Sequence, residues 1–232
     1  MTNLILEKAL RLFSVLKFEG LADVANGRKR PDKTETAVFK IAMMIAALDG
    51  CVTVDEINTF GKLAVLCARM DAEDSAAVLD EGLRVAGYVE IQARRLKEPE
   101  LTELFVAEVR RLLPRGFAVH DSQRVRRALV LWMSMALSDG DYSPVERKCI
   151  RALCRHLSSV MKTSDLADRN AWRTASPMFV VAYSGDSREK SPVRAPDEEF
   201  LRQVETQLKQ IYRGENTVAA FRNLKTMISG VR

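Results

Sequence analysis

A short motif that occurs twice decides the expected fold: residues 49–56 read DGCVTVDE, and residues 139–146, 90 positions further on, read DGDYSPVE. Each copy follows a run of apolar residues, 41–48 before the first and 128–137 before the second. A segment that is apolar on every side is typical of a helix in the middle of a bundle. The repeat therefore predicts two central helices, each ending at an Asp-Gly turn.

The residues after each Asp-Gly pair predict the start of another helix. Thr53 stands three residues before Glu56, and Ser143 stands three residues before Glu146, which is the spacing of a capping box. Pro144 follows Ser143 directly, where proline is favoured in the first turn of a helix. Because glycine can adopt the left-handed conformation that ends helices, each copy predicts a tight helix–turn–helix joint.

Capping gives no role to the aspartates of these turns, since a carboxylate at a helix C-terminus meets the unfavourable end of the helix dipole. Carboxylate oxygens at this spacing could hold a hard cation such as calcium or magnesium. The candidate ligands are Asp49, Glu56, Asp139, Asp141 and Glu146. The loop is not an EF-hand, because glycine immediately follows the first aspartate. A purely structural joint and a divalent-metal site both remain open. The second loop is the better metal candidate, because Cys51 replaces the middle carboxylate of the first.

The composition of the 232-residue chain also indicates an all-α protein. Hydrophobic residues make up 47%, enough for a sizeable core, while 11 glycines, 7 prolines and 6% aromatics disfavour sandwiches and barrels. Helical periodicity predicts helices over residues 3–18, 34–48, 55–70, 73–87, 99–113, 124–138, 148–157, 197–212 and 215–229.

The amino-acid composition changes after residue 162. Residues 163–197 are rich in Ser, Pro, Asp and Arg, with one apolar island at 178–183. We therefore expect an N-terminal amphipathic helix within residues 1–27, a helical domain over 28–162, and a linker with a C-terminal helical extension over 163–232.

Cysteine usage and apolar runs predict a soluble, cytoplasmic protein. The four cysteines (Cys51, Cys67, Cys149 and Cys154) form no Cys-x-x-Cys pair, which disfavours a zinc site and indicates reduced, mostly buried thiols. The first residues carry charges where a signal peptide needs an apolar stretch. Both apolar runs are shorter than the roughly 20 residues that span a bilayer, so no transmembrane segment is expected.

The sequence contains no phosphate-binding glycine loop and no nucleophile elbow, and Cys154 and His156 fall on different faces of one predicted helix. We therefore predict no catalytic residues and no enzymatic activity.

The net charge of +5 is spread along the chain. One local concentration of arginines around the loop 114–123 offers an alternative function, a nucleic-acid-binding helical module that contacts phosphates. Its members are Arg110, Arg111, Arg115, Arg124, Arg126 and Arg127. The other interpretation is a solvated face paired with Glu103 and Glu108.

The repeated pattern of apolar helix, Asp-Gly, any residue, a hydrophobic residue, Ser or Thr, two residues and Glu resembles the TerB tellurite-resistance family and its TerB-like relatives. The resemblance covers about residues 30–160, and residues 137–147 match best. It implies a helical bundle with an internal pseudo-twofold repeat and a non-catalytic binding or scaffold role in stress response. It further implies protein partners, including membrane-associated complexes, and divalent metal binding by the loop acids Asp49, Glu56, Asp139, Asp141 and Glu146. The chain departs from the pattern at Cys51.

Overall fold

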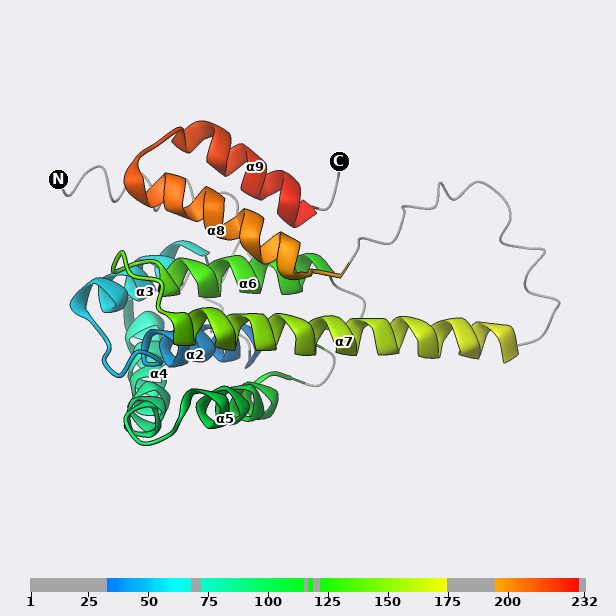
Figure 1. The fold of residues 1–232 in the computed structure, drawn as a ribbon, viewed down its shortest axis with the longest axis horizontal. Coiled ribbons are helices and arrows are strands. Elements are labelled where there is room, and N and C mark those ends of the chain that lie inside the picture. Colours follow the sequence, from blue (N-terminus) through cyan, green and yellow to red (C-terminus); the bar gives the residue numbers. More distant parts are fainter. Residues whose placement is uncertain (1–32, 68–71, 115–116, 119–121, 175–194, 230–232) are drawn as a thin grey trace.

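The computed structural model describes residues 33–67, 72–114, 117–118, 122–174 and 195–229, and within these ranges the chain forms α-helices and no strands (Figure 1). The all-α prediction is confirmed. The helices are α2 (Lys33–Ala46), α3 (Val54–Cys67), α4 (Ala72–Ala93), α5 (Glu98–Leu112), α6 (Ser122–Ala136), α7 (Pro144–Thr174), α8 (Glu198–Arg213) and α9 (Thr217–Ser229). The predicted helix over 3–18 and the apolar island at 178–183 lie outside the described residues.

The two apolar runs form the centre of the core, as predicted. Every residue of 41–48 and of 128–137 is buried. The first run belongs to α2, which packs against α4 and α6, and the second belongs to α6. The indole Nε1 of Trp132 donates a hydrogen bond of 2.9 Å to the Val38 carbonyl, which joins the two central helices across the core.

Helix α7 is longer than the sequence analysis predicted. It runs through Pro144–Thr174, past the expected end at residue 157 and across the expected domain boundary at 162/163. Residues 163–174 contain neither glycine nor proline, so the Ser- and Asp-rich composition alone does not break the helix. The C-terminal half of α7 extends beyond the other helices (Figure 1).

The C-terminal helices α8 and α9 form a hairpin that packs on α6 and α7. Asp197 caps α8 by accepting a hydrogen bond of 2.9 Å from the Phe200 amide, and Gly214 ends the helix at a φ of 78°. Val204 and Leu224 are fully buried. The Tyr212 hydroxyl donates to the Ser134 carbonyl of α6 at 2.8 Å. The hairpin therefore shares one hydrophobic core with the rest of the bundle.

Candidate functional site: the paired Asp-Gly loops

Loop 1 (residues 47–53) joins α2 to α3, and loop 2 (residues 137–143) joins α6 to α7. The same turn closes both. The Gly50 amide donates to the Ala47 carbonyl, and the Gly140 amide donates to the Leu137 carbonyl, each at 3.2 Å. The φ angles of Gly50 and Gly140 are +100° and +92°. Side chains of L-residues strain such a backbone, which explains the glycine in both loops.

Both predicted capping boxes are present. The Glu56 amide donates to Thr53 Oγ1 at 3.2 Å, and the Thr53 amide donates to Glu56 Oε2 at 2.7 Å. In loop 2 the Glu146 amide donates to Ser143 Oγ at 3.2 Å, and the Ser143 amide donates to Glu146 Oε2 at 2.9 Å. These bonds satisfy amides that α3 and α7 leave unpaired at their starts.

The first aspartate of each loop has a structural role that the sequence analysis missed. Asp49 Oδ1 accepts a hydrogen bond of 3.1 Å from the Cys51 amide, and Asp139 Oδ1 accepts one of 3.0 Å from the Asp141 amide. These are Asx turns, in which a side-chain oxygen replaces a backbone carbonyl. The sequence signal was present, because aspartate directly before glycine is a frequent start of such a turn.

The carboxylates of the two loops interact with one another. Burial raises the pKa of Glu56 to about 7 and that of Glu146 to about 8, against the capping hydrogen bonds that lower both. The negative charge of Asp139 in loop 2 further raises the pKa of Glu56, and Asp49 and Glu56 do the same for Glu146. Burial, then Asp139 and Asp141, raise the pKa of Asp49. Loops that are 90 residues apart therefore form one acidic cluster.

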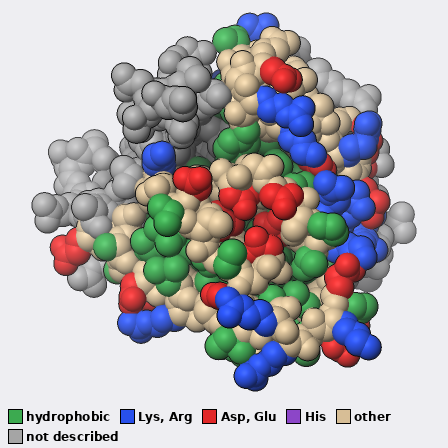
Figure 2. All heavy atoms as spheres, turned by 60° about the vertical axis from the view of Figure 1, so that its left-hand side comes forward, with side chains coloured by type: hydrophobic (Ala, Val, Ile, Leu, Met, Phe, Trp, Pro, Cys, Tyr) green, Lys and Arg blue, Asp and Glu red, His purple; other side chains and the backbone are tan. Residues whose placement is uncertain are grey.

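This acidic cluster has an exposed part and a buried part. Asp49, Asp139 and Asp141 are exposed, whereas Glu56 and Glu146 are only 1% and 3% exposed. Figure 2, which brings forward the end of the bundle where α7 begins, shows acidic side chains gathered in the middle of that face. In the part of the chain that the structure describes, no three His, Cys, Asp or Glu side chains are grouped closely enough to hold a metal ion.

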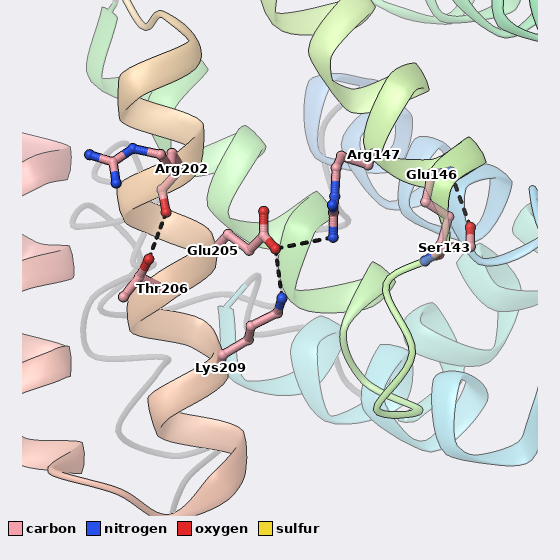
Figure 3. A network of polar contacts seen from close by, with 7 residues as sticks. All are labelled: Ser143, Glu146, Arg147, Arg202, Glu205, Thr206 and Lys209. Atoms are coloured by element: carbon pink, nitrogen blue, oxygen red, sulfur yellow. Dashed lines mark hydrogen bonds and ion pairs between the residues drawn. The ribbon is translucent and has the colours of Figure 1, made fainter.

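An ion-pair network connects loop 2 to the C-terminal hairpin (Figure 3). Arg147, in the first turn of α7, donates to Glu205 of α8 at 3.3 Å, and Lys209 approaches the same oxygen at 2.7 Å. The Arg147 guanidinium also lies 4.9 Å from the centre of the Tyr142 ring in loop 2. No local pattern in the sequence predicts this network, because Arg147 and Glu205 are 58 residues apart.

The arginines proposed to contact nucleic acid that the structure describes all interact with other groups of the protein, and the contacts of three of them are the clearest. Arg111 Nε donates to Glu108 at 2.9 Å, as the alternative interpretation predicted, and Arg110 Nη2 lies 3.2 Å from His156 Nδ1. Arg126 lies over the Phe200 ring, 5.0 Å from its centre. Arg115 lies outside the described residues.

Of the three cysteines whose side chains the structure describes, Cys149 and Cys154 are buried, as the prediction of mostly buried thiols requires, and Cys51 is exposed in loop 1. The Cys149 thiol donates to Thr102 Oγ1 at 3.7 Å, and the Cys154 thiol donates to the Pro196 carbonyl at 3.6 Å. Burial raises the pKa of Cys149 to about 12 and that of Cys154 to about 11, so both thiols are protonated at neutral pH.

Replacing the cap of α7 tests the joint at loop 2. We expect Ser143→Ala to lower the free energy of unfolding by about 1 kcal/mol, because the Glu146 amide loses its acceptor. Urea denaturation measures the change. Ser143→Thr keeps the hydroxyl and should stay close to the native value. Equal losses for both variants would show that the hydroxyl does not stabilise the helix start.

Comparisons with family models, with curated proteins and with solved structures return no match for this chain. Among the described helices, none combines the length and the hydropathy needed to cross a membrane.

Proposed function

We propose that this protein is a non-catalytic, TerB-like binding protein of the tellurite-resistance and stress-response type, and that its paired loops bind a divalent cation. The observation that carries the proposal is the electrostatic repulsion between the carboxylates of the two loops. The charge of Asp139 in loop 2 raises the pKa of Asp49 and Glu56, and the charge of Asp49 in loop 1 raises the pKa of Glu146. A cation between the loops would offset this repulsion. Calcium or magnesium is the expected ion, because both prefer oxygen ligands.

The exposed aspartates are the groups that a cation would reach first. The Asx turns use Oδ1 of Asp49 and Oδ1 of Asp139. Glu56 and Glu146 are buried and hydrogen-bonded in their capping boxes, so they would lie beneath the ion, and its positive charge would favour their ionised forms. Calcium tolerates irregular sites completed by water and backbone carbonyls, which suits two loops that must close around it.

The acidic face is also the surface that we propose for protein partners. A protein that recognises it would carry basic side chains, and its binding would weaken as salt rises. The TerB-like motif supports a scaffold role in the cytoplasm, within complexes that include membrane-associated proteins. The nucleic-acid alternative gains no support, because Arg110, Arg111 and Arg126 already contact groups of this protein.

Thermal unfolding with and without divalent cations tests the metal site. We expect millimolar calcium or magnesium to raise the melting temperature by a few degrees, because a ligand that binds only the folded state stabilises it by mass action. The double variant Asp139→Asn with Asp141→Asn should lose this gain. The control Glu199→Gln removes an exposed carboxylate of α8, far along the chain from both loops, and should keep it. If neither cation shifts the native protein, the loops are only helix joints.

A further inference from the structure

Helix α4 buries one face and exposes the other, and the exposed face carries apolar side chains. Val78, Ala86 and Val89 are buried on the inner side, where α4 packs along α2. On the outer side Leu83 is 37% exposed and Ile91 is 50% exposed. Helix α4 lies at the edge of the bundle (Figure 1), and Leu83 and Ile91 are accessible to a partner there.

A glycine, Gly87, lies midway between these two exposed residues, and no packing contact among the described residues requires it. Glycine inside a helix costs about 0.5–1 kcal/mol relative to alanine. At Gly82 the cost has a packing reason, because an added Cβ would lie 2.8 Å from Met43 Cγ of α2. A Cβ at Gly87 would meet no atom within 4 Å. If another backbone packed closely against the outer side of α4, a Cβ at Gly87 would be excluded there as it is at Gly82.

Charged residues at equal distances before and after Gly87 have opposite signs. Arg84 stands three residues before Gly87 and Glu90 three residues after it, and Asp80 and Arg94 stand seven residues before and after. An antiparallel copy of α4, related by a twofold axis at Gly87, would place each residue opposite its counterpart on the other side of the glycine. Every such pair would join opposite charges.

We propose that the outer face of α4 is a homodimer interface, in which two copies of the chain pack antiparallel about a twofold axis at Gly87. Leu83 of each protomer then packs on Ile91 of the partner subunit, and Arg84 pairs with Glu90 of the partner subunit. Such a contact is isologous and closes on itself.

The charged groups are available for this exchange. Arg84 and Asp80 are paired with each other within α4, and their side chains are 75% and 63% exposed. Arg94 is paired with Glu90 in the same way, at 65% and 29% exposure, and it also donates to the Gly50 carbonyl of loop 1 at 3.0 Å, so the exchange depends mainly on Arg84 and Glu90. The interface is one helix wide, and it therefore falls at the lower end of specific interfaces, below about 1,200 Å² in total. We expect a dimer that dissociates on dilution into the low micromolar range.

Charge reversal tests the proposal in the full chain. Sedimentation velocity over a concentration series should show a dimer for the native protein. Arg84→Glu places like charges opposite each other at both ends of the contact, and so does Glu90→Arg. Each variant alone should therefore weaken dimerisation at least tenfold. An equimolar mixture of the two variants restores opposite charges at both ends, and it should form a heterodimer within a few-fold of the native affinity. A folding defect could not produce this recovery.

A matched pair of glycine variants tests the close approach at the axis. Gly61 of α3 is also a helical glycine around which an added Cβ would meet no atom within 4 Å. Gly87→Leu and Gly61→Leu should both leave the melting temperature of the protomer at or above the native value, while only Gly87→Leu prevents dimerisation.

Several outcomes would overturn the proposal. They are a native protein that stays monomeric up to several hundred micromolar, a dimer that tolerates Arg84→Glu, and a mixture of variants that stays monomeric. A monomer would leave the outer face of α4 to another occupant, such as a partner helix. The proposal is independent of cation binding at the loops.

Discussion

Replacing Trp132 by alanine is expected to lower the free energy of unfolding by about 3–5 kcal/mol, the largest effect of any single substitution considered. Trp132 lies in α6 and is fully buried. Its indole fills the contact between the two central helices, and its Nε1 donates to the Val38 carbonyl of α2 at 2.9 Å. Truncation would therefore leave a cavity and a buried carbonyl without its donor.

Urea denaturation at constant pH measures this loss, and two variants separate its parts. Trp132→Phe keeps most of the apolar volume and removes the donor, so we expect a smaller loss of roughly 1–3 kcal/mol. Val218→Ala, at a side chain of α9 that is 57% exposed, should change stability by no more than about 0.5 kcal/mol. A loss below 1 kcal/mol for Trp132→Ala would mean that α2 and α6 do not depend on this contact.

The sequence predicted the core and the loops because both have short-range signals. The apolar runs before Asp49 and Asp139 are long enough to be recognised as helices that are buried on all sides. The two capping boxes need only residues three positions apart, as in Ser143 and Glu146. Patterns of this kind are local, and the structure confirms them with little change.

Features that depend on residues far apart along the chain could not be predicted. The sequence showed that the two loops are similar, but not that Asp139 lies near enough to Glu56 to affect its pKa. Their proximity depends on how α2 and α6 pack. The pairing of Arg147 with Glu205 likewise depends on how the C-terminal hairpin folds back. The length of α7 differs from the prediction for another reason, because a polar composition predicts a linker but does not by itself end a helix.

The second prediction with a large effect concerns Glu146 and pH. Burial first, and then the charges of Asp49 and Glu56, raise the pKa of Glu146 from 4.5 to about 8 in the folded protein. Between these values the folded protein holds a proton that the unfolded chain has released, so stability falls as pH rises. Glu146→Gln removes the titration and keeps a side chain that can complete a capping box. The variant should therefore be close to the native protein near pH 5 and more stable than it by roughly 4 kcal/mol near pH 9.

Chemical denaturation at intervals of one pH unit gives the difference between the two proteins as a function of pH. Glu56→Gln provides a matched comparison, because the pKa of Glu56 is raised only to about 7 and its pH-dependent loss should be smaller and end about one unit lower. Divalent cations should stabilise the native protein most at high pH, where the loop carboxylates are ionised, and should therefore reduce its loss of stability as pH rises. A difference between Glu146→Gln and the native protein that is constant from pH 5 to pH 9 would show that Glu146 titrates normally. The carboxyl of Glu146 would then be less desolvated, and less affected by Asp49 and Glu56, than the folded structure indicates.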